Sequence, residues 1–211
     1  MTCRKEAGGC GHEFCWICYG DWKSHNNNYN CNKFDERAEK SKEKIKNELD
    51  KYIFNFTRYI NHRKSRDICI SNRELIKNRI NQLFDLHSIP FIENQFLEDG
   101  LNIVEKGRRV LMYTYVFGFY LNSQSKHKLL FEHNQQLLER NCDYLHEMIE
   151  DETLKKIMEE QEFDAFNKKY TEYKAIITNY SSVTNKYIDN LINDIETKMI
   201  GDVVYNTNVH K

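Results

Sequence analysis

The sequence predicts a mainly α-helical protein that begins with a small cysteine-rich module. Of its 211 residues, 1 is Pro and 8 are Gly, whereas 13 are Tyr and 12 are Phe. Sandwiches and barrels use Gly and Pro in their many turns, so this composition favours long helices around an aromatic core. Five of the 7 cysteines lie within the first 31 residues. We therefore expect a module at 1–34, a helical domain at 35–200 and a flexible tail at 201–211.

The overall charge excludes two classes of partner. The chain has 31 basic and 32 acidic residues, which gives a formal net charge of −1. No global field therefore attracts it to nucleic acid or to an anionic membrane surface. The longest apolar run, 110–121, is also shorter than the roughly 20 residues that a membrane-spanning helix needs. We expect neither a nucleic-acid partner nor a membrane one.

The spacing of the early cysteines predicts a zinc site. Cys15 and Cys18 form a CxxC pair, and His25 and Cys31 follow. Three thiolates and one imidazole make a closed tetrahedral set that suits structural zinc, with no open position for water. The alternative for these four residues is a group of reduced buried thiols. We expect Cys69 and Cys142, which are isolated, to be core or half-exposed thiols and not ligands.

Two further cysteines lie upstream of this set. Cys3 and Cys10 have the character of half of a second four-ligand site whose other half is absent. Two ligands alone hold zinc weakly, so we expect Cys3 and Cys10 to be without metal in this chain.

Hydrophobic periodicity predicts the helices of the remainder. A helix is expected over 35–65, starting with a charged run, and a second over 71–86, with Ser71 and Glu74 as a capping box. Pro90 fits the first turn of the next helix. The apolar segment 110–121 could be a buried strand, but the lack of other strand candidates favours a buried helix.

The last third of the chain also has a helical pattern. Leu residues recur with helical spacing over 129–150, and aromatic and aliphatic residues continue the pattern over 151–199. We expect two long antiparallel helices in that last stretch, broken near 178–184. Gly201 is expected to cap the second of them, followed by a frayed tail.

These residues carry a resemblance to a known family. Residues 1–3 and 10–18 (CGHEFCWIC), followed by Trp22, His25 and Cys31, closely resemble the end of the second, catalytic RING of RING-between-RING ubiquitin ligases. The later segments 58–62 (RYINH), 111–117 (LMYTYVF) and 131–135 (FEHNQ) resemble the Ariadne domain that follows this RING in one subfamily.

The resemblance implies a function. Such ligases take ubiquitin from a conjugating enzyme onto a cysteine of the second RING and pass it to a lysine of a protein substrate. The family also implies zinc, an association with cullin-RING ligases, and a cytoplasmic or nuclear location. Here the catalytic cysteine of the family pattern falls just before Met1, so we expect a C-terminal fragment that is inactive alone.

The family further implies that the helical domain covers the catalytic cysteine and inhibits it. In the family, a Phe-Glu pair and an acidic residue make contacts of that kind. The Phe-Glu pair falls at Ile68-Cys69 in this sequence and is not kept, whereas the acidic residue is kept as Asp143. Asp143 is therefore a candidate regulatory residue, the alternative being an ordinary exposed helix carboxylate. For the whole chain, the alternative function is a non-catalytic, zinc-anchored helical interaction module.

Overall fold

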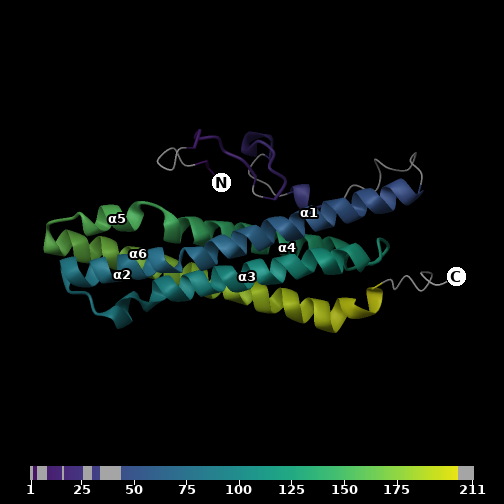
Figure 1. Ribbon diagram of the computed structural model, residues 1–211. Coiled ribbons are helices and arrows are strands. Elements are labelled where there is room, and N and C mark those ends of the chain that lie inside the picture. The colour runs from purple at the N-terminus through teal and green to yellow at the C-terminus, as the bar shows by residue number, and fades with distance from the viewer. Residues whose placement is uncertain (1, 4–8, 16, 26–29, 34–43, 204–211) are drawn as a thin grey trace.

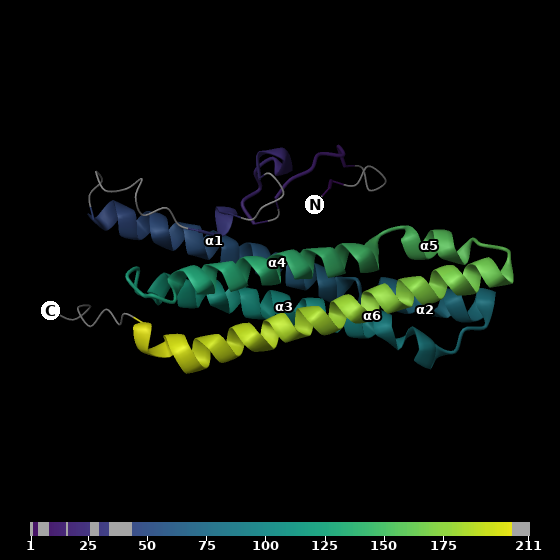
Figure 2. The same ribbon diagram turned by 180° about the vertical axis from the view of Figure 1, so that it is seen from behind.

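The structure is a computed structural model, and it describes residues 2–3, 9–15, 17–25, 30–33 and 44–203. Within these residues the fold is helical apart from isolated β-bridges. Figures 1 and 2 show an elongated bundle of helices, with the N-terminal module lying against one side of it. The helical prediction, including a helix rather than a strand over 110–121, is confirmed.

The bundle is built from four long helices. These are α1 (Lys44–Ser71), α3 (Gln95–Tyr120), α4 (Lys128–Glu150) and α6 (Phe163–Asp194). At one end, α2 (Arg73–His87) and the short α5 (Thr153–Met158) extend the bundle, as Figure 1 shows. Short 3-10 turns lie at Trp22–His25, Asn30–Asn32, Phe91–Asn94 and Ile200–Asp202, and a π-turn at Ile195–Met199 follows α6. No helix in the described part of the chain is long and apolar enough to cross a membrane.

Two hydrophobic clusters fill the bundle. One lies towards α2 and α5 and includes Leu97, Ile149 and Phe166; the other includes Leu111, Leu138 and Ile188. A glycine lets α3 approach its neighbours closely: a Cβ placed on Gly100 would lie 2.8 Å from Cδ1 of Ile149 on α4. Contacts that tight are essentially never seen for real Cβ atoms, so an alanine here would require the Ile149 side chain to shift.

The predicted break at 178–184 is wrong, because α6 runs unbroken from Phe163 to Asp194. Its Ser and Thr residues have modest helix propensity, but Ile177, Ser181, Thr184 and Ile188 are all buried on one face. That face packs on α3 and α4, so tertiary contacts override local propensity. The break lies instead at 159–162, a charged stretch between α5 and α6.

The predicted caps are also wrong. Ser71 is the last residue of α1, and its hydroxyl donates to the Ile68 carbonyl at 2.8 Å instead of capping α2. Gly201 lies within the final 3-10 turn without a positive φ. The start of the expected tail is tied down, since Ser125 Oγ donates to Asp202 Oδ2 at 2.5 Å. The rest of the tail, 204–211, and the first part of the expected charged run, 35–43, lie outside the described residues.

Candidate metal centre and the surface that holds it

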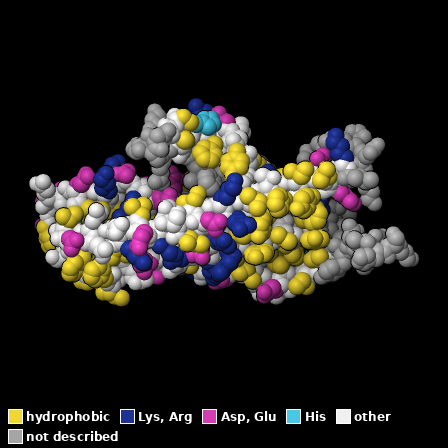
Figure 3. Space-filling model, viewed as in Figure 1, with side chains coloured by type: hydrophobic (Ala, Val, Ile, Leu, Met, Phe, Trp, Pro, Cys, Tyr) yellow, Lys and Arg dark blue, Asp and Glu magenta, His cyan; other side chains and the backbone are white. Residues whose placement is uncertain are grey.

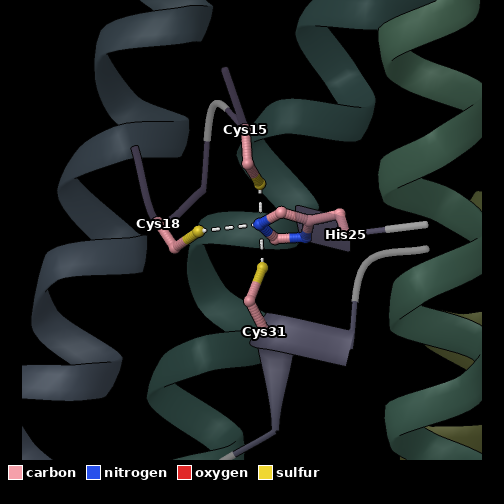
Figure 4. A group of neighbouring side chains, drawn as sticks. All are labelled: Cys15, Cys18, His25 and Cys31. Carbon is pink, nitrogen blue, oxygen red and sulfur yellow. Dashed lines mark hydrogen bonds between the residues drawn. The ribbon is translucent and has the colours of Figure 1, made fainter. Parts of the chain in front are cut away.

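The structure brings Cys15, Cys18, His25 and Cys31 together. Their ligand atoms all lie within 4.8 Å of one another, and Figure 4 shows the side chains converging on one point. The Sγ atoms of Cys15 and Cys31 are 3.7 Å apart, and Cys18 Sγ lies 3.2 Å from His25 Nε2.

These separations fit tetrahedral zinc. Zn–S bonds are about 2.3 Å long, and a tetrahedron's edge is about 1.6 times its centre-to-vertex length, so bound sulfurs lie roughly 3.8 Å apart. The observed S–S separation matches that value. Three thiols and one imidazole also suit zinc chemically, and zinc bound there would hold the fold of the module.

Local backbone contacts shape the CxxC turn. The Cys15 N–H donates to the Gly20 carbonyl and the Tyr19 N–H donates to the Cys15 carbonyl, both at 2.8 Å. Tyr19 takes a left-handed conformation, with φ of 60°, and this reverses the chain. The Gly20 N–H then points at Cys18 Sγ at 3.4 Å, where it stabilises negative charge on sulfur.

A hydrogen bond within the cluster favours the thiolate form of Cys15. The hydrogen bond with Cys31 lowers the pKa of Cys15 to about 6, against the opposing effect of burial. The pKa of Cys31 is raised by the same hydrogen bond, so the two sulfurs share one proton. A thiolate is the form of cysteine that binds metal, and a metal ion would displace the remaining proton.

Cys3 and Cys10 lie side by side, away from this cluster. The Cys10 N–H donates to Cys3 Sγ at 3.4 Å, and the Cys3 N–H donates to the His12 carbonyl at 2.9 Å. Among the described residues they belong to no group of three or more potential ligands. That Cys3 and Cys10 are half of a second zinc site, and that they hold no metal in this chain, stays a prediction.

The module is held on the helical domain through the backbone next to its ligands. On α1, Arg58 Nε donates to the carbonyl of Cys31 at 3.0 Å, and Asn61 Nδ2 donates to that of Ile17 at 2.6 Å. Asn61 Oδ1 in turn accepts from the Tyr19 hydroxyl at 2.7 Å. From the module, Asn32 Nδ2 donates to the Glu132 carbonyl of α4 at 3.0 Å.

These contacts explain the RYINH segment that the sequence made conspicuous. Arg58, Asn61 and Asn32 are each at most 7% exposed. The Arg58 guanidinium also lies over the Phe54 ring, 3.4 Å from its centre. Buried polar groups of this kind are costly unless paired, so they fix where the module sits.

Beneath them lies a buried polar group that sequence reasoning missed. His62 Nε2 is 3.3 Å from Oε1 of Glu139, and the Tyr115 hydroxyl donates to that same oxygen. All three side chains are fully buried, and burial raises the pKa of Glu139 to about 8 and lowers that of His62 to about 3. The pair is therefore neutral near pH 7. His62 and Tyr115 lie in segments that carry the family resemblance, but no pattern in the sequence pairs them with Glu139.

Asp143 is not the exposed carboxylate that was the alternative interpretation. It forms an ion pair with Arg108 of α3, whose side chain is 1% exposed, while its own is 11% exposed. Burial acts to lower the pKa of Arg108, and Asp143 more than offsets this, so the guanidinium stays charged. Whether Asp143 also has a regulatory role is a separate question.

Cys69 and Cys142 are both fully buried, which confirms them as core thiols. Cys69 has no partner at ligand spacing along the chain, but the fold brings His146 Nε2 to 3.4 Å from its Sγ. The same nitrogen lies 2.8 Å from Oε1 of Glu150. This contact joins α1 to α4, and no local pattern could have predicted it.

Comparison with known proteins agrees with this architecture. The family model of the Ariadne domain matches residues 50–210. A probable E3 ubiquitin-protein ligase, rbrA of Dictyostelium discoideum, is 36% identical over 203 residues, which cover 92% of this chain and 38% of that protein. Ariadne-1 of Drosophila melanogaster is 35% identical, covering 71% and 30%, and probable E3 ligase ARI10 of Arabidopsis thaliana is 34% identical, covering 93% and 37%.

The chain spans about a third of the length of these curated relatives. The match to the Ariadne model covers most of the chain, and it begins within α1, after the cysteine cluster. The resemblance seen in the sequence is thereby confirmed: this chain belongs to the Ariadne-domain family, whose relatives are named as E3 ubiquitin-protein ligases.

Proposed function

We propose that this chain is part of a RING-between-RING ubiquitin ligase. Such a ligase accepts ubiquitin from a conjugating enzyme as a cysteine thioester and passes it to a lysine of a protein substrate. The observation that carries the proposal is a four-donor Cys/His cluster seated on an Ariadne domain. Zinc bound by Cys15, Cys18, His25 and Cys31 keeps the module folded in this proposal, and cullin-RING ligases are candidate partners in the cytoplasm or nucleus.

We further propose that the cysteine that accepts ubiquitin is not one of the seven in this chain. The grouping or burial of five of them supports this. Cys15, Cys18 and Cys31 belong to the metal cluster, and Cys69 and Cys142 are fully buried, out of reach of a protein-sized acyl donor. Of the remaining pair, Cys10 is exposed and Cys3 partly so. Any thioester on this chain would therefore be expected on Cys10.

The test is a thioester assay with the chain as it stands. A conjugating enzyme charged with labelled ubiquitin is mixed with the purified chain, and adducts are resolved by gel without reducing agent. We expect no reductant-sensitive ubiquitin adduct. An adduct that Cys10→Ser abolishes would refute the placement of the acceptor outside the chain. The full-length ligase serves as the positive control, because the proposed activity requires its thioester.

The helical domain has a regulatory role in this proposal, as a support that restrains the RING module. The buried contacts of Arg58 and Asn61 with backbone beside the metal ligands favour such a role. Asp143 is the proposed regulatory acid. In the full-length ligase, Asp143→Ala should raise ubiquitin discharge, and an unchanged rate would contradict the role.

The pairing of Asp143 with Arg108 dictates the control for that experiment. Removing the carboxylate also leaves a buried guanidinium unpaired, so a loss of folding could be mistaken for a change in regulation. Asp143→Asn keeps the shape and a hydrogen-bond acceptor, while Arg108→Met removes the charge that needs Asp143. If discharge rises only in variants whose melting temperature falls, the effect comes from unfolding and the regulatory proposal fails.

A further inference from the structure

An exposed aromatic face covers one side of the bundle. It is formed by Tyr52, Ile53 and Phe56 of α1 and by Tyr113, Val116 and Tyr120 of α3, which are between 42% and 59% exposed. Figure 3 shows hydrophobic side chains gathered over α1 and α3 at the end where α3 finishes, with Lys and Arg beside them. Contiguous apolar patches of this kind mark interaction surfaces on soluble proteins.

The aromatic face is a packed unit rather than a scatter of side chains. Tyr52 stacks on Phe56 at 5.6 Å between ring centres and meets Phe119 edge-on at 6.1 Å. Tyr59 meets Tyr113 edge-on at 6.2 Å across the seam between α1 and α3. Neighbouring rings hold one another in place, so little side-chain entropy remains to be lost on binding.

A groove continues the aromatic face towards α6. It has a volume of about 430 Å³ and is lined by Val110, Tyr113 and Phe117 of α3 and by residues at the end of α6, notably Ile192. Arg109 also lines this groove, and so does Glu196. Lys106 of α3 pairs with Asp189 of α6, so the two helices run side by side, with Arg109 nearer that pair and Glu196 further along.

The charges at the edge of this surface are unused. Arg63 lies one turn after Tyr59 on α1, and Arg109 lies one turn before Tyr113 on α3. Both are exposed, as is Glu196. None of the three forms an ion pair within the part of the chain that the structure describes. The surface therefore has two free guanidinium groups at one end, aromatic rings at the other, and a carboxylate between.

We propose that this surface is a dimer interface occupied by a second copy of the chain. In a two-fold contact the same patch faces itself in reverse, so the pattern must be self-complementary. Here an antiparallel arrangement brings Arg63 and Arg109 of each copy over the aromatic end of the other, where guanidinium groups stack favourably on rings.

The available area suits such a contact. Four half-exposed aromatic side chains, each with roughly 200 Å² of surface, offer about 400 Å² of apolar area. That is about half of the ~800 Å² that a standard interface takes from each partner. The rings by themselves therefore suit a small and weak contact. Tyr and Arg are also the residue types that contribute most to binding at interfaces.

Sedimentation velocity on the 211-residue chain tests the proposal, over concentrations from about 1 to about 100 μM, where dimers with micromolar dissociation constants are detected. We expect a concentration-dependent dimer. Tyr120→Ser and Arg109→Glu should each weaken it at least tenfold, whereas Arg140→Glu, an exposed site on α4 outside the face, should leave it unchanged. Far-UV circular dichroism verifies that each variant is folded.

A second arginine tests the stacking itself. Arg63→Glu should weaken the dimer as Arg109→Glu does, because both guanidinium groups are expected over the rings of the other copy. A chain that stays monomeric over the whole range would overturn the proposal. So would a dimer that both Tyr120→Ser and Arg109→Glu leave intact, because its interface would lie elsewhere.

Discussion

The buried ion pair between Arg108 and Asp143 offers the sharpest test of the energetics. Replacing Asp143 with Ala leaves the Arg108 guanidinium without its partner in a place where its side chain is 1% exposed. Breaking a buried pair in this way costs about 3–5 kcal/mol, because the remaining charge has lost its hydration without compensation. Two further nitrogens of Arg108, Nε and Nη1, already have no hydrogen-bond partner among the residues that the structure describes, so relaxation offers little relief.

This free-energy cost can be compared with the total stability of a folded domain. Domains are stable by about 5–15 kcal/mol, so this one substitution removes a large share of the total. For a chain of this size each kcal/mol shifts the melting temperature by roughly 2–4 °C, which predicts a fall on the order of 10 °C. Urea unfolding followed by circular dichroism measures the free energy directly.

A second variant separates charge from packing. Arg108→Met removes the buried charge and keeps an apolar side chain of similar length, so combining it with Asp143→Ala should cost less than the sum of the two single changes. The matched control is Asp189→Ala, which breaks an exposed pair with Lys106 and should cost at most about 1 kcal/mol. If Asp143→Ala costs no more than this control, the pair does not stabilise the fold as argued.

Three other predictions follow from the same structure. The chain should bind one zinc ion, and Cys18→Ser should abolish binding as measured by metal analysis of the purified protein; retained metal would place the site elsewhere. Asn61→Ala should increase amide exchange in the module more than in the bundle, since it removes two contacts across their boundary; equal exchange would show that the module is held by other groups. The unfolding free energy should fall as the pH rises from about 6.5 to about 9. Burial raises the pKa of Glu139 to about 8, and the pKa of His146, which burial acts to lower, is raised to about 9 by hydrogen bonds to Cys69 and Glu150. Both folded-state values exceed the unfolded ones, so this stability is complete below the unfolded pKa values and is lost as pH rises through the folded ones. Glu139→Gln should flatten the lower part of that slope, and an unchanged slope would contradict the assignment.

Local sequence patterns were sufficient to predict the parts of this protein whose structure depends on residues close together in the chain. The lack of other strand candidates favoured a helix over 110–121, although its residues have strand propensity. The CxxC spacing identified Cys15 and Cys18 as candidate metal ligands. Ligand spacing is predictive because a short loop keeps the residues at its two ends close together. The positions of His25 and Cys31 therefore depend little on the rest of the chain. The same local reasoning failed at 178–184, where packing against α3 and α4 keeps a helix intact through residues of modest propensity.

By itself the sequence determined the helical class, the four donors of the candidate metal centre and the family. These depend on composition, periodicity and short spacings, which act within one or a few helical turns. Only the tertiary structure decided which polar groups are buried together: Asp143 with Arg108, His62 with Glu139, and Arg58 with the carbonyl of Cys31. The partners in these pairs are 27 to 77 residues apart. Whether a polar group is charged, and how much free energy its burial costs, depends on which neighbours exclude water from it. Those neighbours come together only when distant helices pack.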